Sequence, residues 1–321
     1  MYGTAFPKLL NGVVFQMFLD WLGALPGAAA QGMIWGIMAI GVYITYKILD
    51  IADLTVDGSI CTGGAVCAIL VVNGVNVWLA MLVAVIAGLI TGLVTGILHT
   101  FMGIPSILAG ILTQLMLWSV NLKIMGKANI ALPIRNYKLI LAQINSLQSI
   151  LTLVIFVCVT IAVLYWFFGR EIGAALRSTG NNIAMSRAQG INTDLAKILG
   201  LVISNGIVAL SGALLSQYQG FADINMGRGA IVIGLAAVVI GEAVVSKLPP
   251  NFAIRLAGVI VGGIIYYVVY QTVIFLGLDA ELLKMLSALV VAVFLALPYW
   301  RKKFFSKSTK AHNHKGGKEN A

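Results

Sequence analysis

The feature of this sequence that most restricts its fold is a series of long apolar segments separated by short polar connections. A helix needs about 20 predominantly apolar residues to cross the hydrocarbon core of a bilayer. Segments near that length lie at 29–48, 59–73, 77–100, 105–122, 147–168, 194–217, 229–246, 252–276 and 281–299. Residues 9–24 contain Asp20 and could form either a further span or an interfacial helix. The pattern predicts an all-α, polytopic membrane protein with about eight to ten transmembrane helices.

The composition excludes a soluble globular domain. Charged residues make up 10% of the 321 residues and hydrophobic residues 60%, whereas a soluble domain carries about 25% charged residues. A chain with so little charge cannot cover its surface with polar groups in water. The segment 59–73 is short and rich in glycine, alanine and cysteine, so we expect it to belong to a discontinuous helix.

Positive charge sets the expected orientation. The net charge is +10, and seven lysines and arginines follow position 300. Cytoplasmic loops carry an excess of Lys and Arg, so we expect residues 1–300 to form the membrane domain and residues 301–321 a basic cytoplasmic tail. The polar loop 169–192 then lies inside and the segment 123–146 outside, while the side of the N-terminus depends on whether residues 9–24 cross. Topology and anionic lipid explain this charge, and we expect no nucleic-acid partner.

The sequence offers no catalytic machinery. Two of the three histidines lie in the tail, His99 ends a span, and neither an HExxH nor a Walker A motif is present. Cys61, Cys67 and Cys158 lie in apolar segments without CxxC spacing, so we expect them to be small apolar side chains in packed helices. We therefore expect no catalytic residue, no metal and no bound cofactor. The chain is not expected to be an enzyme, and ATP, if it drives transport, is expected on a partner subunit.

A cluster of acidic residues lies between two apolar segments, at Asp50, Asp53 and Asp57. Carboxylates are costly in lipid and must face water, a cavity or each other. One interpretation is a discontinuous helix that lines a substrate path; the other is a cytoplasmic turn in which Asp53 is an ordinary helix N-cap. The first interpretation gives the candidate path residues Asp53, Thr55, Asp57, Gly58 and Ser59.

A similar arrangement recurs at residues 221–229, where Asp223 and two glycines precede a small-residue helix. This recurrence could reflect an internal repeat or chance. Glu242 is a further acid within a span, near the cytoplasmic end. Asn205, Ser211 and Ser216 lie on the span 194–217, where we expect helix–helix hydrogen bonds rather than ligand contacts.

The polar loop 169–192 has a regular glycine framework. Residues 171–178 have a helix-forming composition and Gly180 is expected to end that helix, while residues 183–189 can form a second short helix that ends at Gly190. Arg170, Arg177 and Arg187 offer positive charge to phosphate headgroups or to a partner protein. We therefore expect a compact pair of helices at the membrane surface.

This loop resembles the cytoplasmic coupling loop of ABC importer permeases of the ribose and branched-chain amino acid type. The similar features are the initial Gly-Arg, the Ala-Leu-Arg at 175–177, Gly-Asn-Asn at 180–182, Ala-Met-Ser-Arg at 184–187 and Gly-Ile-Asn at 190–192. Segments 53–59, 104–109 and 234–241 also resemble sugar permeases of this type, so the resemblance covers roughly residues 30–300. Asp57 and Glu242 depart from the sugar-permease pattern, and the sequence looks closest to a branch associated with binding proteins for amino acids, including aromatic ones.

The resemblance implies a bacterial cytoplasmic-membrane permease that pairs with a second copy of itself, with ATP-binding cassette subunits and with an extracytoplasmic substrate-binding protein. Such a subunit forms the path for a small polar substrate, such as an amino acid, and ATP binds only to the partner. The alternative is an ion-coupled secondary transporter or channel that uses Asp53, Asp57 and Glu242. The resemblance assigns docking on the ATPase to Arg170, Gly173, Leu176, Arg177, Gly180, Asn182, Arg187 and Gly190.

Overall fold

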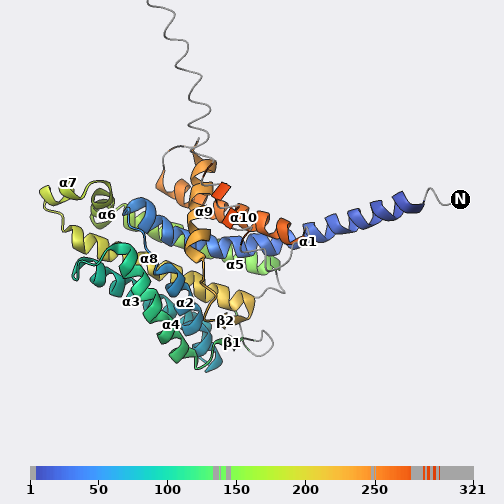
Figure 1. Ribbon diagram of the computed structural model, residues 1–321, viewed down its shortest axis with the longest axis horizontal. Helices are drawn as coiled ribbons and strands as arrows, with labels where there is room; N and C mark the ends of the chain where they lie inside the picture. Colours follow the sequence, from blue (N-terminus) through green and yellow to red (C-terminus); the bar gives the residue numbers. More distant parts are fainter. Residues whose placement is uncertain are drawn as a thin grey trace, which may run out of the picture.

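The computed structural model describes residues 5–132, 146–246 and 251–275, together with a few residues between and beyond these ranges. Its elements are α1 (Ala5–Tyr43), the π-helix η1 (Ile44–Ile48), α2 (Val56–Val72), α3 (Val77–Thr100), α4 (Ser106–Met125), β1 (Asn129–Ala131), α5 (Ser146–Phe168), α6 (Glu171–Asn181), α7 (Ile183–Ala188), α8 (Thr193–Gln219), β2 (Phe221–Asp223), α9 (Ala230–Val245) and α10 (Phe252–Phe275) (Figure 1).

Within the described residues, six helices are long and apolar enough to cross a membrane, and α2 and α9 are shorter apolar helices. The all-α, polytopic fold class is therefore confirmed. The span predicted at 77–100 coincides with α3. Six others agree with their helices to within three residues at each end, namely those predicted at 59–73, 105–122, 147–168, 194–217, 229–246 and 252–276. Residues 9–24 form neither a separate span nor a separate interfacial helix, because they are part of α1, the same helix that carries most of the span predicted at 29–48. The span predicted at 281–299 and the tail 301–321 lie outside the described ranges.

The bundle is built around α8, which packs against α1, α2 and α3. Glycines permit this close packing: a Cβ at Gly63 would collide with the backbone of Ala209, and one at Gly212 with the backbone of Ile60. Small residues are typical of helix interfaces in membranes, where burial of apolar surface gives little driving force. By contrast, α3, α4 and α5 expose wide apolar faces, as lipid-facing helices do.

The segments that connect the helices lie at two opposite ends of the bundle. At one end α6 packs beside Ile48, and the ring of Phe168 lies 5.0 Å from that of Phe252, so η1, α6 and the start of α10 meet there. Strand β1 pairs antiparallel with β2 away from α6 and α7, and the Tyr218 hydroxyl donates to the Gly27 carbonyl at 3.3 Å. This arrangement agrees with the predicted threading of loop 169–192 and segment 123–146 to opposite sides.

Candidate functional site

A buried hydrogen-bond network lies where the chain breaks between η1 and α2. The Asn205 side chain on α8 donates from Nδ2 to Asp53 Oδ2 at 2.8 Å and accepts from the Ser59 hydroxyl at 2.6 Å. Ser59 on α2 also lies 2.7 Å from the hydroxyl of Thr91 on α3. Asp53 is 3% exposed, and Ser59 and Asn205 are 0% exposed. The network joins three elements around a carboxylate that would be costly to bury without partners.

A second row of hydroxyls continues the network toward α4. Thr55 and Thr95 hydroxyls lie 2.8 Å apart, and Thr95 donates to Thr113 at 3.0 Å. All three threonines are buried. Gly58 brings α2 close to α4, because a Cβ there would lie 2.8 Å from the Leu117 side chain. Asn205 was expected to make helix–helix contacts, which it does, but its bond to Asp53 makes it part of the candidate site.

The residue before α2 is Thr55, not Asp53 as expected. Asp53 instead closes the turn that precedes the helix, where its Oδ1 accepts from the Thr55 backbone N–H at 2.9 Å. The predicted N-cap position was therefore two residues too early. Asp53 lies in the irregular chain between η1 and α2, where its carboxylate also accepts a hydrogen bond from Asn205. Helix α2 thus begins in the interior of the protein, where irregular backbone is tolerated because protein surrounds it.

Asp57, in the first turn of α2, caps another helix. Its Oδ2 accepts from the Gly229 N–H and its Oδ1 from the Ile231 N–H, both at 3.0 Å. These amides belong to the start of α9, so the carboxylate satisfies backbone donors that the helix itself leaves free. The two segments that the sequence analysis found similar therefore meet in space. Sequence reasoning missed this contact, because the partners lie 172 and 174 residues apart.

The polar loop 169–192 forms α6 and α7. Gly180 does not end α6, which continues to Asn181; a Cβ at Gly180 would instead collide with the Ile48 carbonyl. The prediction was wrong because a glycine in a sequence can indicate either the end of a helix or a close contact between helices. At Gly180 it is the close contact with Ile48 that leaves no space for a side chain. The expected second helix is present, and Gly190 follows it in the left-handed conformation with φ of 81°.

Of the other residues predicted to couple to the ATPase, some are buried against the bundle or cap a helix, and others lie on its surface. Gly173 and Leu176 are buried against the bundle, and the Asn182 side chain caps α7 by accepting from the Met185 N–H at 3.0 Å. Arg177 donates to the Phe168 carbonyl at 2.9 Å, and the Arg170 guanidinium lies 5.1 Å from the Trp166 ring centroid. Arg187 donates to the Thr193 hydroxyl at 2.9 Å and lies 3.4 Å from the Asp194 carboxylate.

The remaining polar residues make helix contacts. Ser211 donates to the Ile34 carbonyl on α1 at 2.7 Å, as expected, whereas Ser216 donates within its own helix. Glu242 forms an ion pair with Lys47 at 3.0 Å, a partner that sequence reasoning did not identify. Cys61 and Cys67 are buried as expected, but Cys158 is exposed, because it lies on the outward face of α5.

Comparisons with known proteins identify the kind of molecule that carries this arrangement. Residues 25–296 match the profile of a family described as branched-chain amino acid transport system permease components. The chain belongs to this family. A tyrosine transport system permease protein of Clostridioides difficile is 41% identical over 266 residues, which is 83% of this chain and 88% of the relative.

Further relatives of the permease carry other names. An uncharacterized protein of Rickettsia prowazekii is 35% identical over 84% of this chain and 95% of the relative. A fructose import permease of Bifidobacterium longum is 27% identical over 75% of this chain and 68% of the relative. No solved structure matches the chain. The permease is thus a multi-pass membrane subunit of a bacterial ABC importer, located in the cytoplasmic membrane, and family membership decides against the ion-coupled alternative.

The permease presents apolar side chains on its polar loop that the sequence analysis did not select. Ile172 on α6 and Ile183 and Met185 on α7 are all exposed. Large apolar side chains that project from a polar loop are typical of protein interfaces. Their position in an otherwise polar loop could have identified them, because large apolar side chains are unfavourable in a loop that only contacts water.

Proposed function

We propose that this permease imports an amino acid that an extracytoplasmic binding protein delivers, with ATP hydrolysed by a separate subunit. The observation that carries this proposal is the similarity, over most of both chains, to a permease named for tyrosine transport. The relative named for fructose is much less similar. The chain itself contributes a path and a movable helix bundle, and it binds no cofactor in this scheme.

The coupling element in this proposal is the α6–α7 loop. Gly180 seats α6 directly on the backbone of η1, and Gly173 seats it on Phe168 at the end of α5. A rigid contact of this kind transmits a displacement, because close-packed interiors compress little. Docking through Arg170, Arg177 and Arg187 and the apolar side chains of α6 and α7 would therefore move η1 and α5 when the ATPase subunits close.

The substrate path in this proposal runs along the start of α2, between two copies of the permease. Asp53, Thr55 and Ser59 are buried within one subunit, so we assign them the task of holding the broken chain before α2 in shape. Asp57 and Gly58 serve the path by fixing α2 to α9 and to α4. These assignments, and the homodimer, are proposals.

An uptake assay tests the transport function. Cells that express the permease with its ATP-binding and substrate-binding partners are given labelled L-tyrosine, L-leucine or fructose. We expect uptake of an amino acid, and we expect it to stop when the Walker A lysine of the ATPase subunit is replaced. Uptake of fructose alone, or amino-acid uptake that survives loss of ATP hydrolysis, would overturn the proposal.

A pull-down tests the coupling loop. Arg177→Glu and Met185→Asp should weaken co-purification of the ATPase and lower ATP turnover in proteoliposomes, while the permease still inserts in the membrane. Lys127→Glu is the matched control, since Lys127 is exposed beside β1 and away from α6. Normal ATPase binding and transport by both loop variants would show that the loop is not the coupling element.

A further inference from the structure

Residues 224–229 join β2 to α9, and we call them the re-entrant segment. This segment carries Arg228 at a level near the middle of the membrane-spanning helices. Its backbone lies against the first turns of α2, where the Gly227 N–H donates to the Cys61 sulfur at 3.1 Å and the Gly229 N–H to Asp57 at 3.0 Å. A Cβ at Gly227 would collide with the Asp57 carbonyl, so only glycine fits at this position against α2. Arg228 lies between these two anchored residues.

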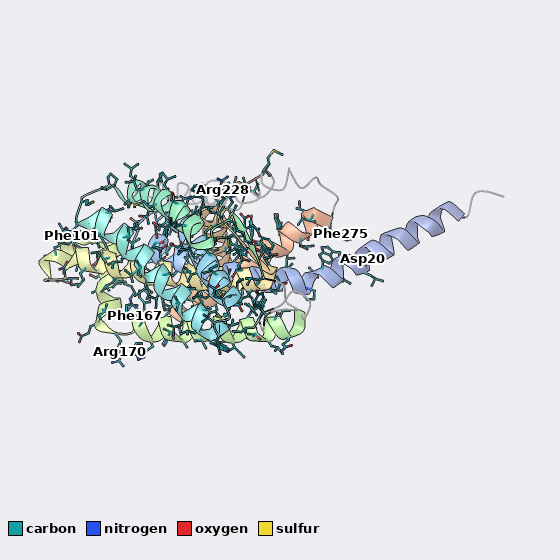
Figure 2. All side chains as sticks on the ribbon, turned by 90° about the horizontal axis from the view of Figure 1, so that it is seen from below. Asp20, Phe101, Phe167, Arg170, Arg228 and Phe275 are labelled. Carbon is teal, nitrogen blue, oxygen red and sulfur yellow. The ribbon has the colours of Figure 1, made fainter. Side chains whose placement is uncertain are left out.

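The depth of Arg228 follows from the helices beside it. Ser59, two residues from Asp57 on α2, is bonded to Asn205 at 2.6 Å. Asn205 is twelve residues from the first and fourteen from the last residue of α8, Thr193–Gln219, so it marks the middle of a membrane-spanning helix. Figure 2 places Arg228 between Phe101 at one end of the bundle and Phe275 toward the other, on the side away from Arg170.

An exposed arginine at that depth requires an explanation. Arg228 is exposed, and within the described residues its guanidinium has neither a salt bridge nor a side-chain hydrogen bond. A charged side chain at the centre of the bilayer costs about 2.5–3.5 kcal/mol on insertion scales, and such residues face water-filled cavities or functional partners. Arg228 therefore faces an aqueous or protein-lined space and not lipid hydrocarbon.

The surroundings favour an anion as the partner of Arg228. The start of α9 follows one residue later, and the partial positive charge of a helix N-terminus adds to that of the guanidinium. The Asp57 carboxylate is bonded to the backbone amides of Gly229 and Ile231, and among the described residues it forms no salt bridge with Arg228. A guanidinium fork matches the geometry of a carboxylate, with which it forms two parallel hydrogen bonds.

We propose that Arg228 is the residue of the translocation path that binds the α-carboxylate of the transported amino acid. The proposal rests on the proposed function and assigns to it a specific contact. A neutral sugar offers no carboxylate to this arginine, so the residue also contributes to the choice of substrate class. The re-entrant segment positions the guanidinium, with Asp57 and Cys61 fixing the backbone on either side of it.

The first test compares uptake by variants of Arg228 in the complete transporter, using whichever of L-tyrosine and L-leucine the unmodified permease imports. Loss of hydrogen bonds to a charged group corresponds to roughly a 10- to 100-fold effect, so Arg228→Gln should lower uptake by that factor. Arg228→Lys should recover part of it, because the charge remains. Membrane insertion and co-purification of the ATPase should be unchanged in both variants.

The second test separates substrate binding from a structural role. Arg228→Cys is made in a Cys158→Ser background, since Cys158 is the exposed native thiol among the described residues. The introduced thiol is treated from outside with a cationic or an anionic methanethiosulfonate. We expect the cationic reagent to restore uptake, the anionic one to leave it low, and saturating substrate to slow both reactions. Lys127→Cys, the control, should react without substrate protection.

The outcomes are distinguishable. If the unmodified permease imports neither amino acid, the proposed function and this inference both fail. If it imports one of them and Arg228→Gln transports normally, the inference alone fails. The inference also fails if uptake is lost but neither reagent nor substrate acts at position 228, because the arginine is then buried between subunits rather than in the path.

Discussion

Removal of the Asp57 carboxylate should destabilise the contact between α2 and α9. The carboxylate accepts from the Gly229 and Ile231 backbone amides at 3.0 Å each, so it serves as the N-cap of a helix that lies elsewhere in the sequence. Replacement of a capping side chain by alanine costs about 0.5–2 kcal/mol. Two charge-assisted bonds are lost here, so we expect Asp57→Ala to cost about 2–4 kcal/mol. Asp57→Asn should cost less, because one amide oxygen remains.

Buried cysteines provide the assay. Cys61 and Cys67 are buried, so a fluorogenic maleimide reports their exposure as detergent-solubilised protein is heated, in a Cys158→Ser background. We expect Asp57→Ala to lower the melting temperature by roughly 4–8 °C. Cys61, whose sulfur accepts from the Gly227 N–H, should be labelled earlier than Cys67, because the loss is local to the start of α9.

The matched control is Asp194→Ala. Asp194 pairs with Arg187 at 3.4 Å, with both side chains more than half exposed, so its removal should change stability by no more than about 0.5 kcal/mol. If Asp57→Ala melts with the parent protein and labels both buried cysteines at the same temperature, the cap does not hold α9. The structural role assigned to Asp57 would then be refuted.

Three further predictions concern the end of the bundle that holds α6. Gly180→Ala should reduce ATP-driven uptake without loss of membrane insertion, because its Cβ would force α6 away from the Ile48 carbonyl; normal uptake would contradict that close contact. Lys47→Glu should lower the melting temperature by an amount that corresponds to about 0.2–1 kcal/mol, the usual contribution of a partly exposed ion pair. Addition of Glu242→Lys should restore the melting temperature, whereas additive losses in the double variant would exclude a direct ion pair. A thiol at Ser178 should resist impermeant maleimide added outside intact cells, and efficient labelling would invert the topology.

The spans could be predicted from the sequence because lipid leaves the backbone few alternatives. An apolar segment that crosses a bilayer must satisfy its amides internally, and the resulting helix begins and ends where polarity returns. The agreement of 77–100 with α3 is an example. The joining of residues 9–24 to the following span was not predictable in this way, because Asp20 weakens the apolar pattern without breaking the helix.

The candidate site was only partly predictable. The residues from Asp53 to Ser59 were selected because carboxylates beside an apolar segment need partners, and the structure shows that they have them. The identity of those partners depends on tertiary packing that brings α8 and α9 beside α2. The role of Gly180 was misjudged for the same reason, since the atom that excludes a side chain there belongs to Ile48, far away in the sequence. The path and coupling roles of these residues remain predictions.

The glycine contacts of the bundle have a consequence for how it can move. A Cβ at Gly262 would collide with the Ala237 carbonyl, and one at Gly32 would lie 2.6 Å from the Ile264 Cα, so α1, α9 and α10 touch backbone to backbone. Helices in such contact cannot slide past one another without separating first. They form one stiff block. Helix α8 is joined to this block in the same way, because a Cβ at Gly41 on α1 would lie 2.8 Å from the Ser204 carbonyl, and Gly63 and Gly212 join α2 to α8. Bending is then left to the irregular chain at 49–55 and to residues 220–229, where Gly220 and Gly229 have φ of 76° and 82°. Any movement during transport would then displace this core as one rigid body, with bending confined to those joints.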